Sequence, residues 1–212
     1  MPKKTPAQKN PRNPVETRQR LVGATVQLIL KQGFTATSVE QICNEAKLTK
    51  GSFFHHFESK EAVGKAAVEW WGAFGTSLYA EAWKDTGLDP LHQLHRMFDI
   101  MSGFTERSNQ VCTCVVGMLS QELAQSHPDL REECSRQLDL WTANTAKMLT
   151  AAKKWHQPKA KFDPVEIAWF LNSLWQGSML IGKTRQEPAM IRRNLQLARA
   201  WVDGLFGIQR GK

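Results

Sequence analysis

Apolar residues recur at helical spacing along most of the chain, from about residue 15 to residue 206. The first such stretch covers residues 15 to 32 and ends before Gly33, a residue type that commonly closes helices. Its apolar face holds Leu21, Ala24, Thr25, Leu28 and Ile29. Strand signals are scarce, since long alternating runs are missing and the chain has a single Tyr. The pattern predicts an all-α protein.

Residue types that cap helices divide the next part of the chain into short segments. Ser38 with Gln41 forms a capping box, Thr49 can cap a second short helix, and Ser59 can cap a long one. Asp89-Pro90 opens a further helix because Pro is favoured in a first turn. The helices expected after Gly33 span residues 39–47, 50–57, 60–85, 89–107, 115–125, 129–155, 164–184 and 188–206.

Positive charge is concentrated near the amino terminus. The formal net charge of the 212 residues is +8, and residues 1–60 hold ten Lys or Arg against four acidic residues, which is +6 of that excess. Such a surface suits a polyanion, although a solvated basic face has the same composition. Residues 1–14 contain four of the nine prolines, so we expect a flexible basic arm there.

The cellular context follows from what the sequence lacks. It shows neither the apolar core of a signal peptide nor an apolar run long enough to span a membrane. The four cysteines are too few and too unevenly spaced for a disulfide framework. We therefore expect a cytoplasmic protein without a membrane partner.

The helices expected over 39–47 and 50–57 are joined by the turn Lys47-Leu48-Thr49, which is the spacing of a helix-turn-helix. In that motif the second helix enters the major groove of DNA. The exposed face of this second helix is polar and cationic, whereas two apolar residues that lie four positions apart on it are expected in the core. The exposed residues are Lys50, Gly51, Ser52, His55, His56 and Lys60, and the core pair is Phe53 and Phe57.

The run GFTATSVEQICNEAKLTKGSFFHHFESKEAV, residues 33–63, resembles the motif of the tetracycline-repressor-like (TetR) family of regulators, and the resemblance covers about residues 15–70. It implies an all-α protein with an N-terminal three-helix DNA-binding module over 15–60. A larger helical ligand-sensing and dimerisation domain over 61–212 would follow. Phe54 departs from the family pattern, in which Tyr is frequent, and Cys43 stands where a small Ala is common.

Carried over position by position, the resemblance implies a double-stranded DNA partner with a palindromic operator. It implies phosphate contacts from Ser38, Thr49, His56 and Lys60, and base or sugar contacts from Lys50, Ser52, Phe54 and His55. The basic arm could reach a neighbouring groove, or serve only as a solubilising tail. Repression released by an unidentified small-molecule effector is the expected mode of action, and no cofactor is expected.

A homodimer is expected because one helix-turn-helix binds DNA weakly. The last two expected helices carry more apolar surface than one subunit can readily bury, and the family resemblance implies a four-helix interface there. The alternative is that this surface closes the core of the monomer. The residues assigned to dimerisation are Trp169, Leu174, Trp175, Ile191, Leu195 and Trp201.

Large aromatic and Met side chains are dense between residues 61 and 155, where the resemblance implies a ligand pocket, although most such residues are ordinarily core. The residues assigned to the pocket are Trp70, Phe74, Phe98, Met101, Cys112, Cys114, Met118 and Trp141. The run around Cys112 and Cys114 looks like a segment of a TetR subgroup that includes repressors responding to reactive electrophiles. At a helix amino terminus either thiol would gain thiolate character, whereas the alternative is ordinary packing.

Three further hypotheses deserve a test. His92 and His95 could join the cysteines in a metal site, but the spacing is not a standard motif, and we assign no metal.

Residues 177–184, GSMLIGKT, match a phosphate-binding loop, yet the preceding residues show no strand, so we expect helix and no enzyme. A non-specific architectural DNA binder would share the charge but would not need the aromatic C-terminal part.

Overall fold

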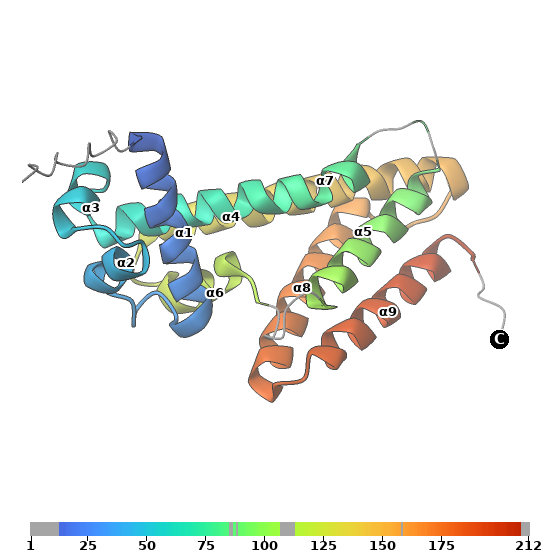
Figure 1. Cartoon of the computed structure of the whole chain (residues 1–212). Helices are drawn as coiled ribbons and strands as arrows, with labels where there is room; N and C mark the ends of the chain where they lie inside the picture. The colour runs from blue at the N-terminus through green and yellow to red at the C-terminus, as the bar shows by residue number, and fades with distance from the viewer. Residues whose placement is uncertain (1–12, 85–86, 88, 107–112, 158, 209–212) are drawn as a thin grey trace, which may run out of the picture. The chain divides into compact units, whose positions relative to one another are not determined.

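The structure is a computed structural model that describes residues 13–84, 87, 89–106, 113–157 and 159–208. These residues form nine helices and no strand, which confirms the predicted all-α class (Figure 1). None of the described helices is long and apolar enough to cross a membrane. The helices are α1 (Pro14–Gln32), α2 (Val39–Glu45), α3 (Lys50–His56), α4 (Lys60–Trp83), α5 (Pro90–Glu106), α6 (Val115–Leu123), α7 (Pro128–His156), α8 (Pro164–Arg185) and α9 (Pro188–Leu205).

The chain divides into two compact units, an N-terminal unit over Met1–Ala67 and a C-terminal unit over Val68–Lys212. We expected the first domain to end at residue 60, whereas the N-terminal unit extends to Ala67. The reason is packing, because Val63 and Ala66 in the first turns of α4 are buried in the core of that unit. The expected basic arm falls mostly on residues 1–12, which lie outside the described residues.

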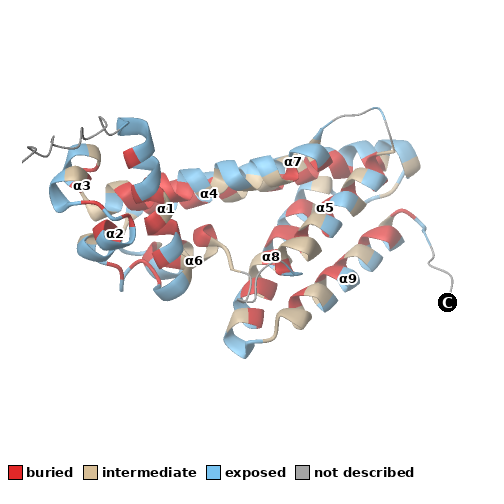
Figure 2. Cartoon of the chain, viewed as in Figure 1, coloured by how far each residue is buried: buried red, intermediate tan, exposed pale blue. Residues whose placement is uncertain are grey.

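Helices α1, α2 and α3 pack against one another around a small apolar core. Leu21, Ile42 and Phe53 are fully buried at its centre, and Phe57 closes it. Leu21 belongs to α1, Ile42 to α2, and Phe53 and Phe57 to α3 and its C-cap, so their burial ties α1 to two seven-residue helices that would be marginal in isolation. The buried faces are visible as red bands in Figure 2.

The caps predicted from the sequence are present. Ser38 accepts from the backbone N–H of Gln41 at 3.2 Å, and the Gln41 side chain accepts from the N–H of Ser38 at 2.8 Å, which completes the capping box. Thr49 caps α3 by accepting from the N–H of Ser52 at 3.1 Å. Ser59 likewise accepts from the N–H of Ala62 at 3.1 Å. Capping thus fixes where α2, α3 and α4 begin.

The turn between α2 and α3 is a Schellman motif. The N–H of Lys47 donates to the carbonyl of Asn44 at 3.0 Å, and the N–H of Leu48 donates to that of Cys43 at 2.8 Å. Buried Leu48 and Cys43 supply the apolar contact that accompanies this motif. Lys47 has a φ of 53°, the left-handed conformation usually given to Gly. The motif therefore ends α2 at Glu45, two residues before the predicted end.

The C-terminal unit has its core among α5, α7, α8, α9 and the later part of α4. Helix α8 packs against both α7 and α9, and α5 runs beside α9 (Figure 1). Gly182 permits the close approach of α8 and α9, since a Cβ at this position would lie 2.6 Å from the side chain of Ile191. The GSMLIGKT run lies wholly inside α8, so it forms no phosphate-binding loop.

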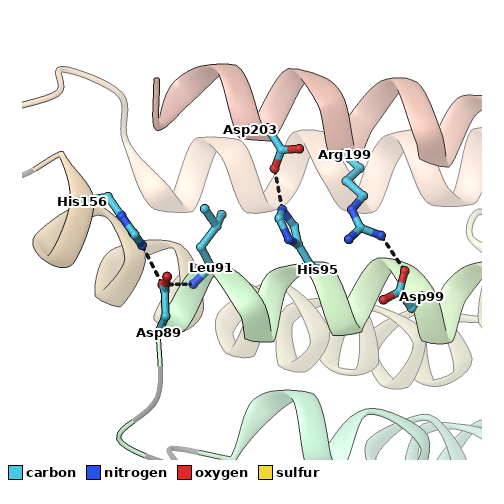
Figure 3. A network of polar contacts seen from close by, with 7 residues as sticks. All are labelled: Asp89, Leu91, His95, Asp99, His156, Arg199 and Asp203. Carbon is cyan, nitrogen blue, oxygen red and sulfur yellow. Dashed lines mark hydrogen bonds and ion pairs between the residues drawn. The ribbon is translucent and has the colours of Figure 1, made fainter. Parts of the chain in front are cut away.

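Polar links tie α5 to its neighbours (Figure 3). His95 on α5 contacts the buried carboxylate of Asp203 on α9 at 2.5 Å, and Arg199 donates to Asp99 at 2.5 Å. Asp89, which caps α5 by accepting from Leu91, contacts His156 at the end of α7 at 2.6 Å. These contacts fix the register of α5 against α7 and α9.

Candidate functional site

Helix α3 presents a polar outer face because two aromatic rings hold its inner face in the core. Phe53 is fully buried and Phe57 nearly so, whereas Lys50, Phe54 and His55 are exposed. Phe54 is 57% exposed and meets Phe53 edge to face at 5.2 Å between ring centres. An exposed aromatic ring beside a lysine and a histidine can contact base edges or sugars in a DNA groove.

Two of the remaining expected DNA contacts are half-buried. Ser52 lies in the first turn of α3, and His56 lies at its end with its ring 5.0 Å from that of His55. The two histidine rings meet edge to face and form a polar rim at the carboxyl end of the helix. Ser52, His55 and His56 thus extend the outer face of α3 in both directions from Phe54.

The hydroxyls of Ser38 and Thr49 are exposed, although each also serves as a helix cap. In a cap the oxygen accepts a hydrogen bond from the backbone, which leaves the O–H free to donate. Each side chain is therefore held in one orientation with a donor available to a phosphate oxygen. Their positions at the starts of α2 and α3 place the two donors on the helix-turn-helix itself.

Lys50 forms an exposed ion pair with Glu40, whose carboxylate lies 3.3 Å from its Nζ atom. Glu40 belongs to the first turn of α2 and Lys50 to the first turn of α3, so the pair spans the motif. Because both side chains are more than half exposed, this pair stabilises the fold little. Its main effect is electrostatic. Because Glu40 offsets part of the charge of Lys50, the ion pair reduces the positive charge that the helix-turn-helix presents to DNA.

Lys60 has a different environment from the one we expected. Its Nζ atom donates to the carbonyl oxygens of Phe34 at 3.2 Å and Thr37 at 3.1 Å, and it lies 4.4 Å from the centre of the Phe34 ring. The ammonium therefore binds the connection between α1 and α2. Our expectation of a simple phosphate contact is revised to a role in holding this turn, with one remaining N–H available to DNA.

The C-terminal unit contains a pocket with about 710 Å³ of empty space, part of it open to solvent. Its walls come from α4, α7 and α8, from Phe104 on α5 and from the residues at the start of α6. Of the residues assigned to a pocket from sequence, Phe74, Cys114 and Trp141 line it. The sequence reasoning did not assign Tyr79, Trp83, Gln137, Asn172 or Trp175, which line it as well.

The other assigned pocket residues lie elsewhere. Phe98 and Met101 are fully buried in the core of the unit and do not border the pocket, so this part of the expectation is corrected. Met118 lines a neighbouring shallow groove, and Trp70 is exposed and stacks on Phe74 with ring centres 5.8 Å apart. Cys112 lies outside the described residues.

The three described cysteines differ in environment. Cys114 is half-buried, takes the N-cap position of α6 and borders the pocket. Burial raises the pKa of Cys43, and burial raises the pKa of Cys134 to about 11. Both buried cysteines are therefore protonated thiols with a packing role, and of the three described cysteines Cys114 is the one placed where a small molecule can meet it.

The outer faces of α8 and α9 are apolar and exposed. Phe170 and Trp201 lie 4.9 Å apart between ring centres and link the two helices at the surface. Of the residues assigned to dimerisation, Trp169 and Trp201 are each 42% exposed and Leu174 is half-buried. Trp175, Ile191 and Leu195 are buried in the core of the unit, so their assignment to the dimer interface is corrected. Other exposed apolar residues on these two helices, outside that assignment, are Phe170, Leu180, Ile181 and Leu197.

The hypothesis of a metal site is not supported by the geometry. His95 is engaged with Asp203, and the described residues contain no group of three or more His, Cys, Asp or Glu that could hold a metal ion.

Comparison with known proteins gives two family matches. Residues 21–67 match the tetR family of bacterial regulatory proteins, and residues 90–198 match the tetracyclin repressor-like C-terminal domain. The chain is 28% identical over 170 residues to the transcriptional regulator AcuR of Cereibacter sphaeroides, covering 80% of this chain and 78% of that one. It is also 28% identical over 175 residues to the transcriptional repressor NemR of Escherichia coli, covering 79% and 84%.

Solved structures show the same fold. A regulatory protein described as TetR from Rhodobacter sphaeroides superimposes with a TM-score of 0.79 at 26% identity, covering 86% of this chain and 97% of that one. The reduced form of Escherichia coli NemR gives a TM-score of 0.78 at 24% identity, covering 89% and 96%.

Proposed function

The chain belongs to the TetR family of bacterial regulatory proteins and is a DNA-binding transcriptional regulator, and on this premise we propose that it is a homodimeric repressor of a palindromic operator. An effector that enters the C-terminal unit would release it from DNA. The observation that carries the proposal is the outer face of α3, where exposed Lys50, Phe54 and His55 are held out by buried Phe53 and Phe57.

In the proposed complex α3 lies in the major groove. Lys50, Ser52, Phe54 and His55 contact bases or sugars, because they lie on the outer face of α3 or in its first turn. Phosphate contacts come from the hydroxyls of Ser38 and Thr49 and from the ring of His56. Phe54 can pack on a thymine methyl or a sugar, but it lacks a hydroxyl to donate to phosphate.

The dimer that we propose forms through α8 and α9. Exposed apolar side chains gather on both helices, and a patch of that kind on a protein surface is typical of an interface. A two-fold dimer presents two copies of α3 about one turn of DNA apart, which matches the symmetry of a palindrome. The relatives named as repressors support this mode of action.

Release from DNA would follow effector binding in the pocket lined by Phe74, Trp141 and Cys114. A ligand that favours a dimer with a different spacing of its recognition helices weakens operator binding by its differential affinity for the two states. A reactive electrophile is a second candidate signal, supported by Cys114 on the pocket wall. An electrophile should release DNA from the wild type and not from Cys114→Ser; equal release from both would remove Cys114 as the sensor.

Selection of bound fragments from a random duplex DNA pool tests the proposal. Enrichment of a palindrome with half-sites about one turn apart is expected. Binding without enrichment would contradict sequence recognition and favour an architectural DNA binder. Loss of all DNA binding would contradict the assignment of α3.

A further inference from the structure

The pocket of the C-terminal unit is aromatic and uncharged. Among the described residues that line it, none is an Asp, Glu, Lys, Arg or His, and the walls carry several large rings. These include Trp71, Phe74, Tyr79, Phe104 and Trp175. A charged ligand would lose its hydration here without meeting an opposite charge, which is costly in an apolar site. Flat rings, in contrast, stack favourably on such walls.

Two hydrogen-bond donors in the same wall have no acceptor. The indole Nε1 atoms of Trp83 and Trp141 are buried, and no described group accepts a hydrogen bond from either. Both indoles contact the same ring, since the centre of Tyr79 lies 5.1 Å from that of Trp83 and 6.3 Å from that of Trp141. A buried indole N–H usually has a partner, and leaving it without one costs free energy.

The described amide groups of the pocket accept no hydrogen bond from either indole, and the NH₂ groups of two of these amides are held by other partners. Asn172 donates to the hydroxyl of Thr142 at 2.9 Å, and Gln137 donates to the carboxylate of Glu133 at 2.7 Å. Gln137 is also fixed in place, since its side chain fills the space beside Gly72 where a Cβ would lie. Among the pocket-lining residues that the structure describes, the buried side-chain polar atoms without a partner are the Nε1 atoms of Trp83 and Trp141.

From these observations we propose that the pocket binds an uncharged, flat, conjugated molecule whose carbonyl or nitro oxygen accepts hydrogen bonds from the indole N–H groups of Trp83 and Trp141. Binding of this class satisfies two buried donors, stacks a ring on aromatic walls and brings no charge into the pocket. A molecule of this class would be the effector, and only its ability to release the protein from DNA rests on the proposed function.

Three small probes of similar size separate the contributions of the aromatic ring, the hydrogen-bond acceptor and the charge to binding. Acetophenone has a ring and a neutral acceptor, ethylbenzene has the ring without the acceptor, and benzoate adds a negative charge. The full-length protein labelled with ¹⁵N in the tryptophan indoles is titrated with each probe by NMR. The chain has eight tryptophans, and Trp83→Phe and Trp141→Phe assign the two signals of interest.

Acetophenone is expected to bind and to shift the Trp83 and Trp141 indole signals downfield, as new hydrogen bonds do. Ethylbenzene should bind about tenfold more weakly without that downfield shift, and benzoate should not saturate the site. Each Phe variant should weaken acetophenone binding several-fold, whereas Trp155→Phe, which removes an exposed indole outside the pocket, should not. The comparison of probes on the wild type needs no variant to fold.

Equal affinity for acetophenone and ethylbenzene, tighter binding of benzoate, or no saturable binding of acetophenone would overturn the proposal. Release of operator DNA is measured separately on the same samples. If acetophenone shifts both indoles and the protein stays on DNA, the ligand class stands and the effector role of the pocket fails. If acetophenone releases DNA with neither indole shifted, the inference about the two indoles fails while the proposed repressor function stands.

Discussion

The ammonium of Lys60 at the start of α4 donates to the carbonyl oxygen of Phe34 at 3.2 Å and lies over the ring of the same residue. A charged donor that binds a carbonyl in a half-buried site contributes about 2 kcal/mol. This contact links the end of α1 to the start of α4 through the turn that precedes α2.

Lys60→Met should therefore lower the free energy of unfolding by about 2 kcal/mol, because the Met side chain keeps the apolar stem but satisfies neither carbonyl. Urea unfolding measures the change, and Lys65→Met, an exposed position on α4, is the control. At a temperature where both variants are folded, the salt dependence of DNA binding should change little. Wild-type stability together with a salt slope reduced by one phosphate contact would restore our first expectation for Lys60.

Lys50 is expected to read sequence. Lys50→Met should lower affinity for the operator by about tenfold to a hundredfold and affinity for random DNA much less, because a base contact is lost only on the operator. Fluorescence anisotropy with both DNAs measures the two losses. Glu40→Gln is the counterpart, since it removes the carboxylate 3.3 Å from Lys50 and should strengthen binding to both DNAs. Equal losses on both DNAs for Lys50→Met would contradict base reading.

Replacement of Lys by Gly should have opposite effects on the free energy of unfolding at Lys47, whose backbone is left-handed, and at Lys31, whose backbone is helical. Lys47→Gly should raise the free energy of unfolding by about 0.5 to 1 kcal/mol, because Gly adopts a φ of 53° without strain. Lys31→Gly, in the last turn of α1, should lower it by about 1 kcal/mol because its backbone is helical. Thermal unfolding of the two variants checks this, and a loss of stability in both would contradict the assigned turn.

The Asp89 to His156 pair predicts a dependence of stability on pH. Burial alone would raise the pKa of Asp89, but the hydrogen bond from His156, the N–H of Leu91 and the nearby histidine charges lower it overall. A lowered folded pKa means that Asp89 stabilises the fold above its unfolded value of 3.8, and that this contribution is lost as the pH falls through the folded pKa.

Asp89→Asn keeps the cap on α5 and removes the charge. At pH 6 it should be less stable than the wild type by about 1 kcal/mol, and the difference should shrink below about pH 4. Melting temperatures between pH 3 and pH 7 measure this. The control is Asp139→Asn, which changes an exposed carboxylate on α7. A constant difference at every pH would show that the loss is not electrostatic.

The proposed dimer face predicts that Trp201→Lys gives a monomer by sedimentation, because a charge replaces a ring at the contact with Phe170 on the surface of α8 and α9. Operator affinity should fall with it. Trp155→Lys changes a ring that is 61% exposed at the end of α7 and should remain a dimer. A dimeric Trp201→Lys protein would move the interface away from this face.

Local signals in the sequence predicted the helices, their caps, and the buried and exposed faces of α3 well. The caps at Ser38, Thr49 and Ser59 depend on residues three apart, so the sequence contains them directly. The burial of Phe53 and Phe57 follows from their four-residue spacing on a helix whose other face is polar.

Tertiary contacts determined what the sequence could not give. Helix α8 is apolar around most of its circumference, so spacing alone could not place Trp175 inside and Phe170 outside. Phe98 and Trp83 are similar large residues on helices that follow one another in the chain, yet packing puts Phe98 in the core and Trp83 at the pocket. The role of Lys60 depends on carbonyl groups 23 and 26 residues away in the chain.

The central claim is sequence recognition by two copies of α3 on one operator. Its most direct test is the affinity of the protein for the selected palindrome and for the same fragment with one half-site scrambled, at near-physiological salt. The account predicts two chains per palindrome and a loss of at least about a hundredfold on scrambling, because several base contacts disappear together. Equal affinity for the two fragments would contradict it.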